Sequence, residues 1–328
     1  MLFNCWRKAI NKPDQIIAVR LITVSEDEAG QRLDNYLLRQ LKGVPKTRLY
    51  KAVRKGEVRV NKGRVKPDVR LNAGDVVRIP PLREAQSQSK NHLTARWAER
   101  IKASLLLDND DLMVINKPSG LAVHGGSGVD VGLIESLRQM YPEQRYMELV
   151  HRLDRDTSGL ILIAKRASVL RELHGLLRGN GIDKRYLTLV YGRWPAYLKE
   201  VDAPLEKFSL PSGERMVKVS AQGKRALTRF QVVARLTGAT LLEAKPITGR
   251  THQIRVHARH AGNPILGDTK YGTPESQELT ERIGLKRLFL HAASLRFTTN
   301  TQRYDLAAPL PSLLQTLVDG LDNGRDRH

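Results

Sequence analysis

The chain of 328 residues is 41% hydrophobic and carries 55 Lys and Arg against 34 Asp and Glu, a formal net charge of +21. This length favours one large domain plus a small one, the apolar content excludes wholesale disorder, and the positive charge favours nucleic acid or an anionic membrane as a partner. No apolar run approaches the roughly 20 residues of a membrane span, and no secretory signal is evident. The single cysteine excludes internal disulfides and multi-cysteine zinc sites. We therefore expect a cytoplasmic protein that binds nucleic acid.

A small basic domain is expected over residues 23–82, after an extension over residues 1–22 that shows weak patterning. Apolar residues recur at helical spacing and predict a short amphipathic helix, at Leu33, Tyr36, Leu37 and Leu41. A second helix is expected to begin after a cap at Thr47 and to end at Gly56. Short strands are predicted after it, over 57–60, 65–71 and 76–79.

The second predicted helix is basic on one face and apolar on the other. Its basic face carries Arg48, Lys51 and Lys55. Residues 31–80 together hold 14 Lys or Arg and 4 Asp or Glu. A solvated face would explain an isolated basic helix, but the hairpin that follows adds Lys62 and Arg64, so we expect a phosphate-binding surface. Two small helices followed by a basic hairpin resemble the S4 RNA-binding module.

A linker is expected over residues 83–103, followed by a larger domain over residues 104–320 and a tail over residues 321–328. The larger domain opens with a predicted hairpin, LLLDNDDLMVI. Further strands are expected at 160–164, 186–191, 227–233, 240–244 and 289–297, and helices at 167–178 and 251–261. Because strands outnumber helices without regular βαβ alternation, we predict an α+β fold with a mostly antiparallel sheet.

The stretch HRLDRDTSGL, residues 151–160, places two carboxylates, two guanidiniums and an imidazole before an apolar run. Solvated charges and a Thr-Ser-Gly turn are the ordinary interpretation of such a segment. However, a strand-like run precedes the charges, and a short loop clamped between two core strands holds its side chains in fixed positions. We therefore consider the loop a candidate site, in which Asp154 requires a cationic partner to remain ionised.

The segment GRTHQIRVH, residues 249–257, offers that partner. It is predicted to begin a helix with Thr251 as a possible cap. Alone it would be interpreted as a basic amphipathic helix, but beside the aspartate loop it can direct Arg255 at an anion and pack Ile254 in the core. Its histidines lack the spacing of a recognised metal pair, so structural or RNA-facing roles are expected for His252, His257 and His260.

A third segment, KRY at residues 184–186, places Tyr186 at the head of a predicted strand. Such a tyrosine is usually half-buried in the core, but it can also stack on a displaced base. Together, HRLDRDTSGL, KRY and GRTHQIRVH resemble the signature segments of the RluA-type pseudouridine synthase family. The resemblance covers roughly residues 104–297, and an N-terminal S4 module is common in that family. The phrases SGERMVKVS and KRYLTLVYG are most similar to family members that act on large-subunit ribosomal RNA.

The resemblance implies a role for each matching residue. Asp154 would act at the ribose C1′, Arg255 would pair with it, and Tyr186 would stack on the base and assist proton removal. Arg152 would help to hold or replace the flipped nucleotide, and Ile254 would pack beneath the site. The residues expected to bind the substrate are those of the same motifs, His151, Arg152, Arg250 and Ile254.

The implied reaction breaks the N1–C1′ bond of a uridine, rotates the base and joins C5 to C1′, so neither a cofactor nor a metal is expected. The target base must first leave its stack. Two alternatives remain open: a non-catalytic RNA-binding or ribosome-assembly factor, and an RNA glycosidase or nuclease that uses Asp154 and Asp156 as an acid–base pair. The expected partner is large-subunit ribosomal RNA or a pre-ribosomal particle, with no membrane contact, and the expected state is a monomer.

Overall fold

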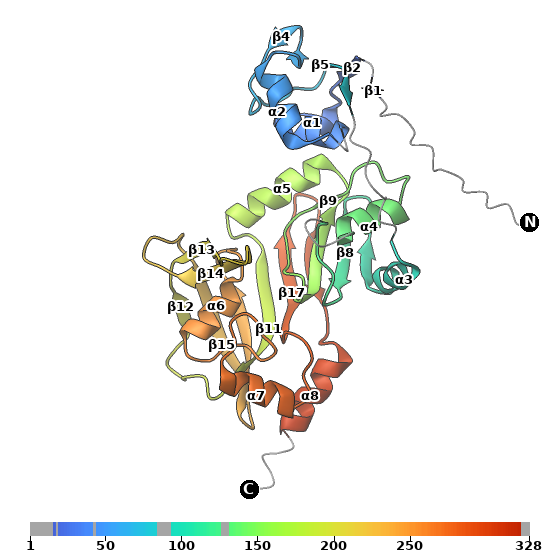
Figure 1. Cartoon of the computed structure of the whole chain (residues 1–328). Coiled ribbons are helices and arrows are strands. Elements are labelled where there is room, and N and C mark those ends of the chain that lie inside the picture. The colour runs from blue at the N-terminus through green and yellow to red at the C-terminus, as the bar shows by residue number, and fades with distance from the viewer. Residues whose placement is uncertain (1–15, 18, 42–43, 84–92, 126–130, 323–328) are drawn as a thin grey trace, which may run out of the picture. The chain divides into compact units, whose positions relative to one another are not determined.

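The computed structural model describes residues 16–17, 19–41, 44–83, 93–125 and 131–322, and it divides the chain into two compact units, Met1–His92 and Leu93–His328 (Figure 1). Parts of the expected extension, linker and tail lie outside the described residues, namely 1–15, 84–92 and 323–328. None of the helices in the described ranges combines the length and the apolar character that crossing a membrane requires.

The first unit packs two short helices against a small antiparallel sheet. The helices are α1 (Leu33–Gln40) and α2 (Lys46–Arg54). The sheet has the strand order β2 (Arg20–Thr23), β5 (Val76–Ile79), β3 (Arg59–Val60) and β4 (Gly63–Arg64), and β1 (Ile16–Ile17) pairs separately with β6 (Leu82–Arg83). The apolar face of α2 is buried as predicted, at Leu49, Ala52 and Val53. Its basic face is thereby turned outward, with Lys51 and Lys55 exposed.

Three sequence predictions for this unit differ from the structure in detail. Residues 65–71 form no strand, because Pro67 has no amide hydrogen to donate to a ladder and Val69 N instead donates to Lys66 O at 3.3 Å in a turn. Thr47 does not cap α2, because the cap position is Pro45 and the helix begins at Lys46, two residues earlier than predicted. The expected extension over residues 1–22 also reaches into the fold, since residues 20–22 belong to β2.

The second unit is built on one ten-stranded sheet. Its strands are β7 (Leu105–Asp108), β8 (Leu112–Lys117), β9 (Glu148–Leu149), β10 (Ser158–Ala164), β11 (Asp183–Tyr191), β12 (Glu200–Asp202), β15 (Leu227–Leu236), β16 (Ala239–Pro246), β17 (Leu290–Thr298) and β18 (Arg303–Ala307). The order is β12-β15-β16-β11-β17-β10-β8-β7, with β18 beside β17 and β9 beside β10. Of the strand pairs described in this sheet, β10 with β17 is the parallel one, so the predicted α+β fold with a mostly antiparallel sheet is confirmed.

Helices and one hairpin complete the second unit (Figure 1). The helices are α3 (Ala95–Ala103), α4 (Leu133–Met140), α5 (Ala167–Arg178), α6 (Gln253–His260), α7 (Pro274–Arg282) and α8 (Ser312–Asp322), and the hairpin is β13 (Leu205–Ser209) with β14 (Arg215–Val219). The helix predicted over 167–178 is confirmed at both ends. The linker expected over 83–103 is shorter, because α3 begins after a cap at Thr94 and packs through the buried Ile101.

The central strand β10 explains the apolar run that follows the charged loop. It is buried at all seven positions, between β8 on one side and β17 on the other. Gly159 lies where β10 meets β17, at a φ of +108°, and a Cβ there would lie 2.3 Å from Ala292 O. The charged loop can therefore join the parallel strand pair only through a glycine at this position.

We predict that Gly159→Ala lowers the free energy of unfolding by more than about 2 kcal/mol, because the new Cβ adds both backbone strain and overpacking. Gly175→Ala is the matched control, since Gly175 lies inside α5 with nothing within 4 Å of a built Cβ. The free energy of unfolding of the control should rise by about 0.5–1 kcal/mol, because alanine has a higher helix propensity than glycine. Urea unfolding of both variants measures the difference, and equal stabilities would contradict the close approach.

Candidate active site

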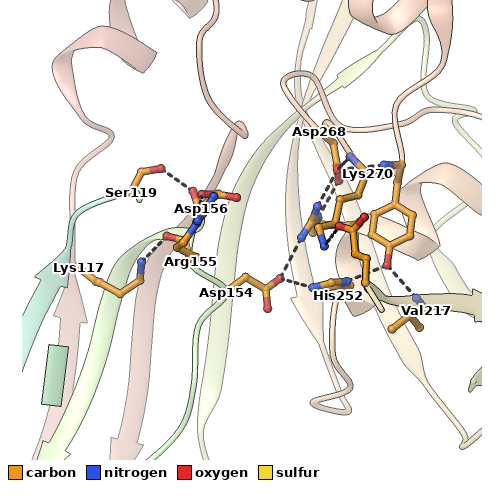
Figure 2. Close-up of polar contacts among 12 residues, drawn as sticks. Lys117, Ser119, Asp154, Arg155, Asp156, Val217, His252, Asp268 and Lys270 are labelled. Carbon is orange, nitrogen blue, oxygen red and sulfur yellow. Dashed lines mark hydrogen bonds and ion pairs between the residues drawn. The ribbon is translucent and has the colours of Figure 1, made fainter. Parts of the chain in front are cut away.

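The loop that carries Asp154 connects β9 to β10 and is fixed from behind through its main chain. Lys117 Nζ, at the end of β8, donates a hydrogen bond to Arg155 O at 3.0 Å and to two carbonyl oxygens of its own segment at 3.1 and 2.9 Å. Ser119 Oγ donates to Asp156 O at 2.7 Å (Figure 2). Because these contacts use carbonyl oxygens, the loop keeps its shape without engaging its charged side chains.

Lys117 is an unusual residue for this task, because its side chain is fully buried. Burial lowers the pKa of Lys117 to about 7, although the negative charges of Asp156 and Asp154 partly oppose the shift. The hydrogen bonds of the Lys117 amine to carbonyl oxygens satisfy the donors that burial would otherwise leave unpaired.

The other end of the loop is held by a buried polar chain. Ser158 Oγ accepts a hydrogen bond from Arg287 Nη2 at 2.7 Å and donates one to His291 Nδ1 at 2.8 Å. His291 Nε2 in turn donates to Ala308 O at 3.1 Å. Burial lowers the pKa of His291, which is consistent with this neutral tautomer. The loop is thus anchored at both ends to the sheet.

Arg255 lies on α6 and is buried beside two carboxylates. Its Nη1 lies 3.5 Å from Asp154 Oδ2, as the sequence predicted. Its stronger partner is Asp268, whose oxygens accept from Arg255 Nε at 2.8 Å and from Nη2 at 2.7 Å. The guanidinium also lies over the ring of Tyr271, 5.1 Å from its centroid. This bidentate pair holds the guanidinium in one orientation, from which its remaining nitrogen faces Asp154.

The start of α6 differs from the sequence prediction. Thr251 does not cap the helix; the N-terminal cap position is His252, which makes no capping hydrogen bond through its side chain. The turn is held instead by Gln253, whose Oε1 accepts from Arg250 N at 3.0 Å. His257 is fully buried, with its ring nitrogens at 2.9 and 3.0 Å from oxygens of neighbouring segments, so its structural role is as expected.

Tyr186 lies on β11 at an irregularity of the sheet. The pairing of β11 with β17 shifts register between Arg185 and Tyr186, as a β-bulge does. Bulges are common beside active sites because they re-aim a side chain. Burial raises the pKa of Tyr186, and the negative charge of Asp154 raises it further. The phenol therefore stays protonated at neutral pH.

A cavity of about 630 Å³ collects the predicted site residues. All seven line it, namely His151, Arg152, Asp154, Tyr186, Arg250, Ile254 and Arg255. Arg152 and Arg250 are exposed, whereas Ile254 is buried in the core below. Burial and the neighbouring Lys184 lower the pKa of His151 to about 4, so its ring is neutral and Nε2 accepts a hydrogen bond from Leu162 N at 3.3 Å. The cavity thus has an apolar floor, one carboxylate and a cationic rim.

Sequence reasoning missed three residues that shape this site. Asp268 anchors Arg255, Lys117 holds the loop, and Tyr271 accepts a hydrogen bond from Val217 N at 3.0 Å while contacting His252. Lys117 offered a signal, because it is a charged residue at the end of a largely apolar segment, residues 112–117. Asp268 and Tyr271 offered none, since their importance comes from segments that only folding brings together.

The five basic residues predicted to bind RNA all belong to the first unit. Lys51, Lys55, Lys62 and Arg64 are exposed, whereas Arg48 is half-buried with its Nη2 at 3.6 Å from Glu57 Oε2. In the described part of the chain, no group of three or more His, Cys, Asp or Glu side chains is placed to hold a metal ion.

Comparisons with known proteins point to one family. The family described as RNA pseudouridylate synthase matches residues 111–260, and the S4 domain matches residues 31–77. A Haemophilus influenzae protein named "Ribosomal large subunit pseudouridine synthase C" is 54% identical over 85% of this chain and 87% of its own length. A protein of the same name from Yersinia pestis is 55% identical over 90% of this chain and 94% of its own length. The solved structure "Human RNA Pseudouridylate Synthase Domain Containing 4" is 25% identical, covers 71% of this chain and 96% of its own, and superposes with a TM-score of 0.58.

The low pKa of Lys117 predicts a pH dependence of stability. In the unfolded chain a lysine has a pKa of about 10.4, so between pH 7 and pH 10 the folded state binds fewer protons than the unfolded state. The free energy of unfolding of the wild type therefore rises over this range by up to about 1.4 kcal/mol per pH unit because of this group. Lys117→Met removes that gain, as well as the hydrogen bonds to the loop. Urea unfolding followed by tryptophan fluorescence should therefore show that the stability difference between wild type and variant widens as pH rises. Parallel stability curves would contradict the burial of the amine.

Proposed function

The chain belongs to the RNA pseudouridylate synthase family, as an enzyme that isomerises uridine in RNA to pseudouridine, and we propose that its substrate is large-subunit ribosomal RNA. The names of the two bacterial relatives support this substrate, and each relative matches this chain over nearly its whole length. The S4 match supports RNA binding by the first unit. We further propose that the enzyme acts in the cytoplasm as a monomer.

The observation that carries the catalytic proposal is Asp154 at the cavity wall, with the guanidinium of Arg255 at 3.5 Å. The reaction breaks the N1–C1′ bond and forms a C5–C1′ bond, while C5 loses a proton and N1 gains one. A carboxylate that reaches the ribose can stabilise positive charge at C1′, attack it, or take a ribose proton. We assign that task to Asp154, which Arg255 orients and whose charge Arg255 complements as water leaves the site.

The remaining cavity residues are assigned to holding the displaced nucleotide. Unstacking a base costs a few kcal/mol, and stacking on an aromatic ring returns about 1–3 kcal/mol. Tyr186 supplies such a ring, and Ile254 supports the floor beneath it. Arg152, His151 and Arg250 line the same cavity, where the two exposed guanidiniums can bind phosphate or replace the flipped base.

The two alternative functions are less well supported. A non-catalytic assembly factor would not need Asp154, Tyr186 and Arg255 gathered in one cavity, and the relatives named above are synthases. A glycosidase would need Asp156 as a partner of Asp154, yet Asp156 does not line the cavity and its Oδ1 accepts from Arg155 Nε at 3.3 Å. The geometry therefore favours one catalytic carboxylate.

Replacement of the carboxylate tests this assignment. With ribosomal RNA transcripts labelled by tritium at uracil C5, the wild type should release the label, and Asp154→Asn should reduce release to background because the amide cannot support charge at C1′. Asp156→Asn is the matched control and should keep most of the activity. RNA binding by both variants should stay near that of the wild type. Retained label with the wild type, or equal loss in both variants, would contradict the proposal.

The basic face of α2 is proposed to bind phosphates. Neutralising Arg48, Lys51 and Lys55 together should reduce the slope of log affinity against log salt concentration by up to about 2 to 3, because each lost phosphate contact removes about 0.7–0.9. A triple variant that exchanges lysine and arginine at these positions keeps the charge and should keep the slope. Fluorescence anisotropy on ribosomal RNA fragments at several salt concentrations measures both slopes. An unchanged slope in the neutral variant would exclude this face from binding.

A further inference from the structure

His252 has an unusual backbone for a residue with a ring. Its φ of 54° and ψ of 18° lie in the left-handed region, which is uncommon for residues other than glycine, although asparagine, aspartate and histidine adopt it more often than the rest. Gln253 holds this geometry, because its Oε1 accepts from Arg250 N at 3.0 Å and from Thr248 Oγ1 at 2.7 Å, and its Nε2 donates to two oxygens of β15 at 2.9 Å. Strain that the surroundings maintain in this way is concentrated at functional sites.

The hydrogen bonds around the ring assign its tautomer. Val217 N donates to Tyr271 Oη at 3.0 Å, and in the tautomer that we assign the phenol donates its own proton to His252 Nδ1, 2.7 Å away. The proton of the neutral imidazole is then on Nε2. Burial lowers the pKa of His252, an effect that the charge of Asp154 only partly opposes, and this is consistent with a neutral ring.

The protonated nitrogen faces the catalytic carboxylate. His252 Nε2 lies 3.9 Å from Asp154 Oδ2, and Arg255 Nη1 lies 3.5 Å from the same oxygen (Figure 2). Two donors from the start of α6 thus converge on Oδ2 and leave Oδ1 without either of them. Separations of this size commonly shorten when a substrate fills the site and excludes water.

A purely structural role explains the ring less well. Glycine or asparagine would adopt the left-handed backbone at little cost, so packing alone does not require a histidine at this position. The side chain also lines the cavity beside Asp154 instead of lying in the apolar core. The strained backbone therefore has a consequence at the site: it turns Nε2 toward Asp154.

We propose that His252 is a positioning residue that holds Asp154 Oδ2 through its Nε2 proton, so that Oδ1 is presented to the ribose. Tyr271 is part of this arrangement, because its hydroxyl fixes the tautomer of His252 while its own position is fixed by the β13–β14 hairpin at Val217. This inference rests on the proposed function, since it concerns the geometry of the same carboxylate.

A pair of matched variants tests the donor. His252→Leu removes the Nε2 proton, and His252→Gln supplies an amide proton near the same place; both side chains are unbranched at Cβ and therefore strain the backbone alike. Under single-turnover conditions with the full chain and ribosomal RNA transcripts, His252→Leu should slow tritium release by about 100-fold, the scale expected when a reacting group is misplaced. His252→Gln should recover most of that rate.

Binding and stability separate positioning from folding. The RNA Kd of His252→Leu should stay within about twofold of the wild type, and its Tm should match that of His252→Gln. Tyr271→Phe keeps the ring over Arg255 but loses the hydroxyl that fixes the tautomer, so it should also slow release without weakening RNA binding.

The outcomes are distinguishable. An active wild type with an unaffected His252→Leu variant overturns this inference alone. An equal loss of rate in His252→Leu and His252→Gln also overturns it, because the loss would then come from structure and not from the donor. A wild type that releases no label contradicts the proposed function, and with it this inference.

Discussion

The bidentate ion pair between Arg255 and Asp268 is the constraint on which the site depends. Both side chains are almost completely buried, and their hydrogen bonds of 2.7 and 2.8 Å consume two nitrogens of the guanidinium. A buried charge without a partner is strongly unfavourable, so Asp268 is what allows an arginine to lie beneath the cavity. The third nitrogen then faces Asp154 at 3.5 Å with an orientation that neither residue could fix alone.

The aspartate loop is fixed in a complementary way, through its main chain. Lys117 and Ser119 bind carbonyl oxygens of the loop, and Ser158 joins its end to Arg287 and His291. Lys117, Ser158 and His291 are buried with their polar atoms paired, whereas Asp154 is left facing the cavity. Fixing the backbone and freeing one carboxylate is what a reaction at a bulky, displaced nucleotide requires.

Two physical tasks are divided between the two units. The first unit concentrates positive charge on the surface of α2 and the following hairpin, and the phosphate contacts proposed for these residues would supply affinity that does not depend on base identity. In the proposed reaction, the cavity of the second unit would supply the few contacts that act on one nucleotide. Unstacking a single base is unfavourable, and the cavity contacts alone would offset this cost only in part. Binding to many phosphates can offset the remainder.

The sequence by itself determined the fold class, many of the strands and the helix over 167–178, because apolar periodicity is a local feature. Its short motifs also predicted that Asp154, Tyr186 and Arg255 belong to one site, and the three residues line the same cavity. It did not determine the strand content of residues 65–71, where a turn at Pro67 replaced the expected ladder, nor the cap of α6, where Gln253 rather than Thr251 holds the turn. Only the tertiary structure decided that Asp268 anchors Arg255, that Lys117 holds the loop and that His252 faces Asp154. The reason is physical: each of these contacts joins segments from different elements, so their energies depend on burial and distance that exist only after the strands have paired.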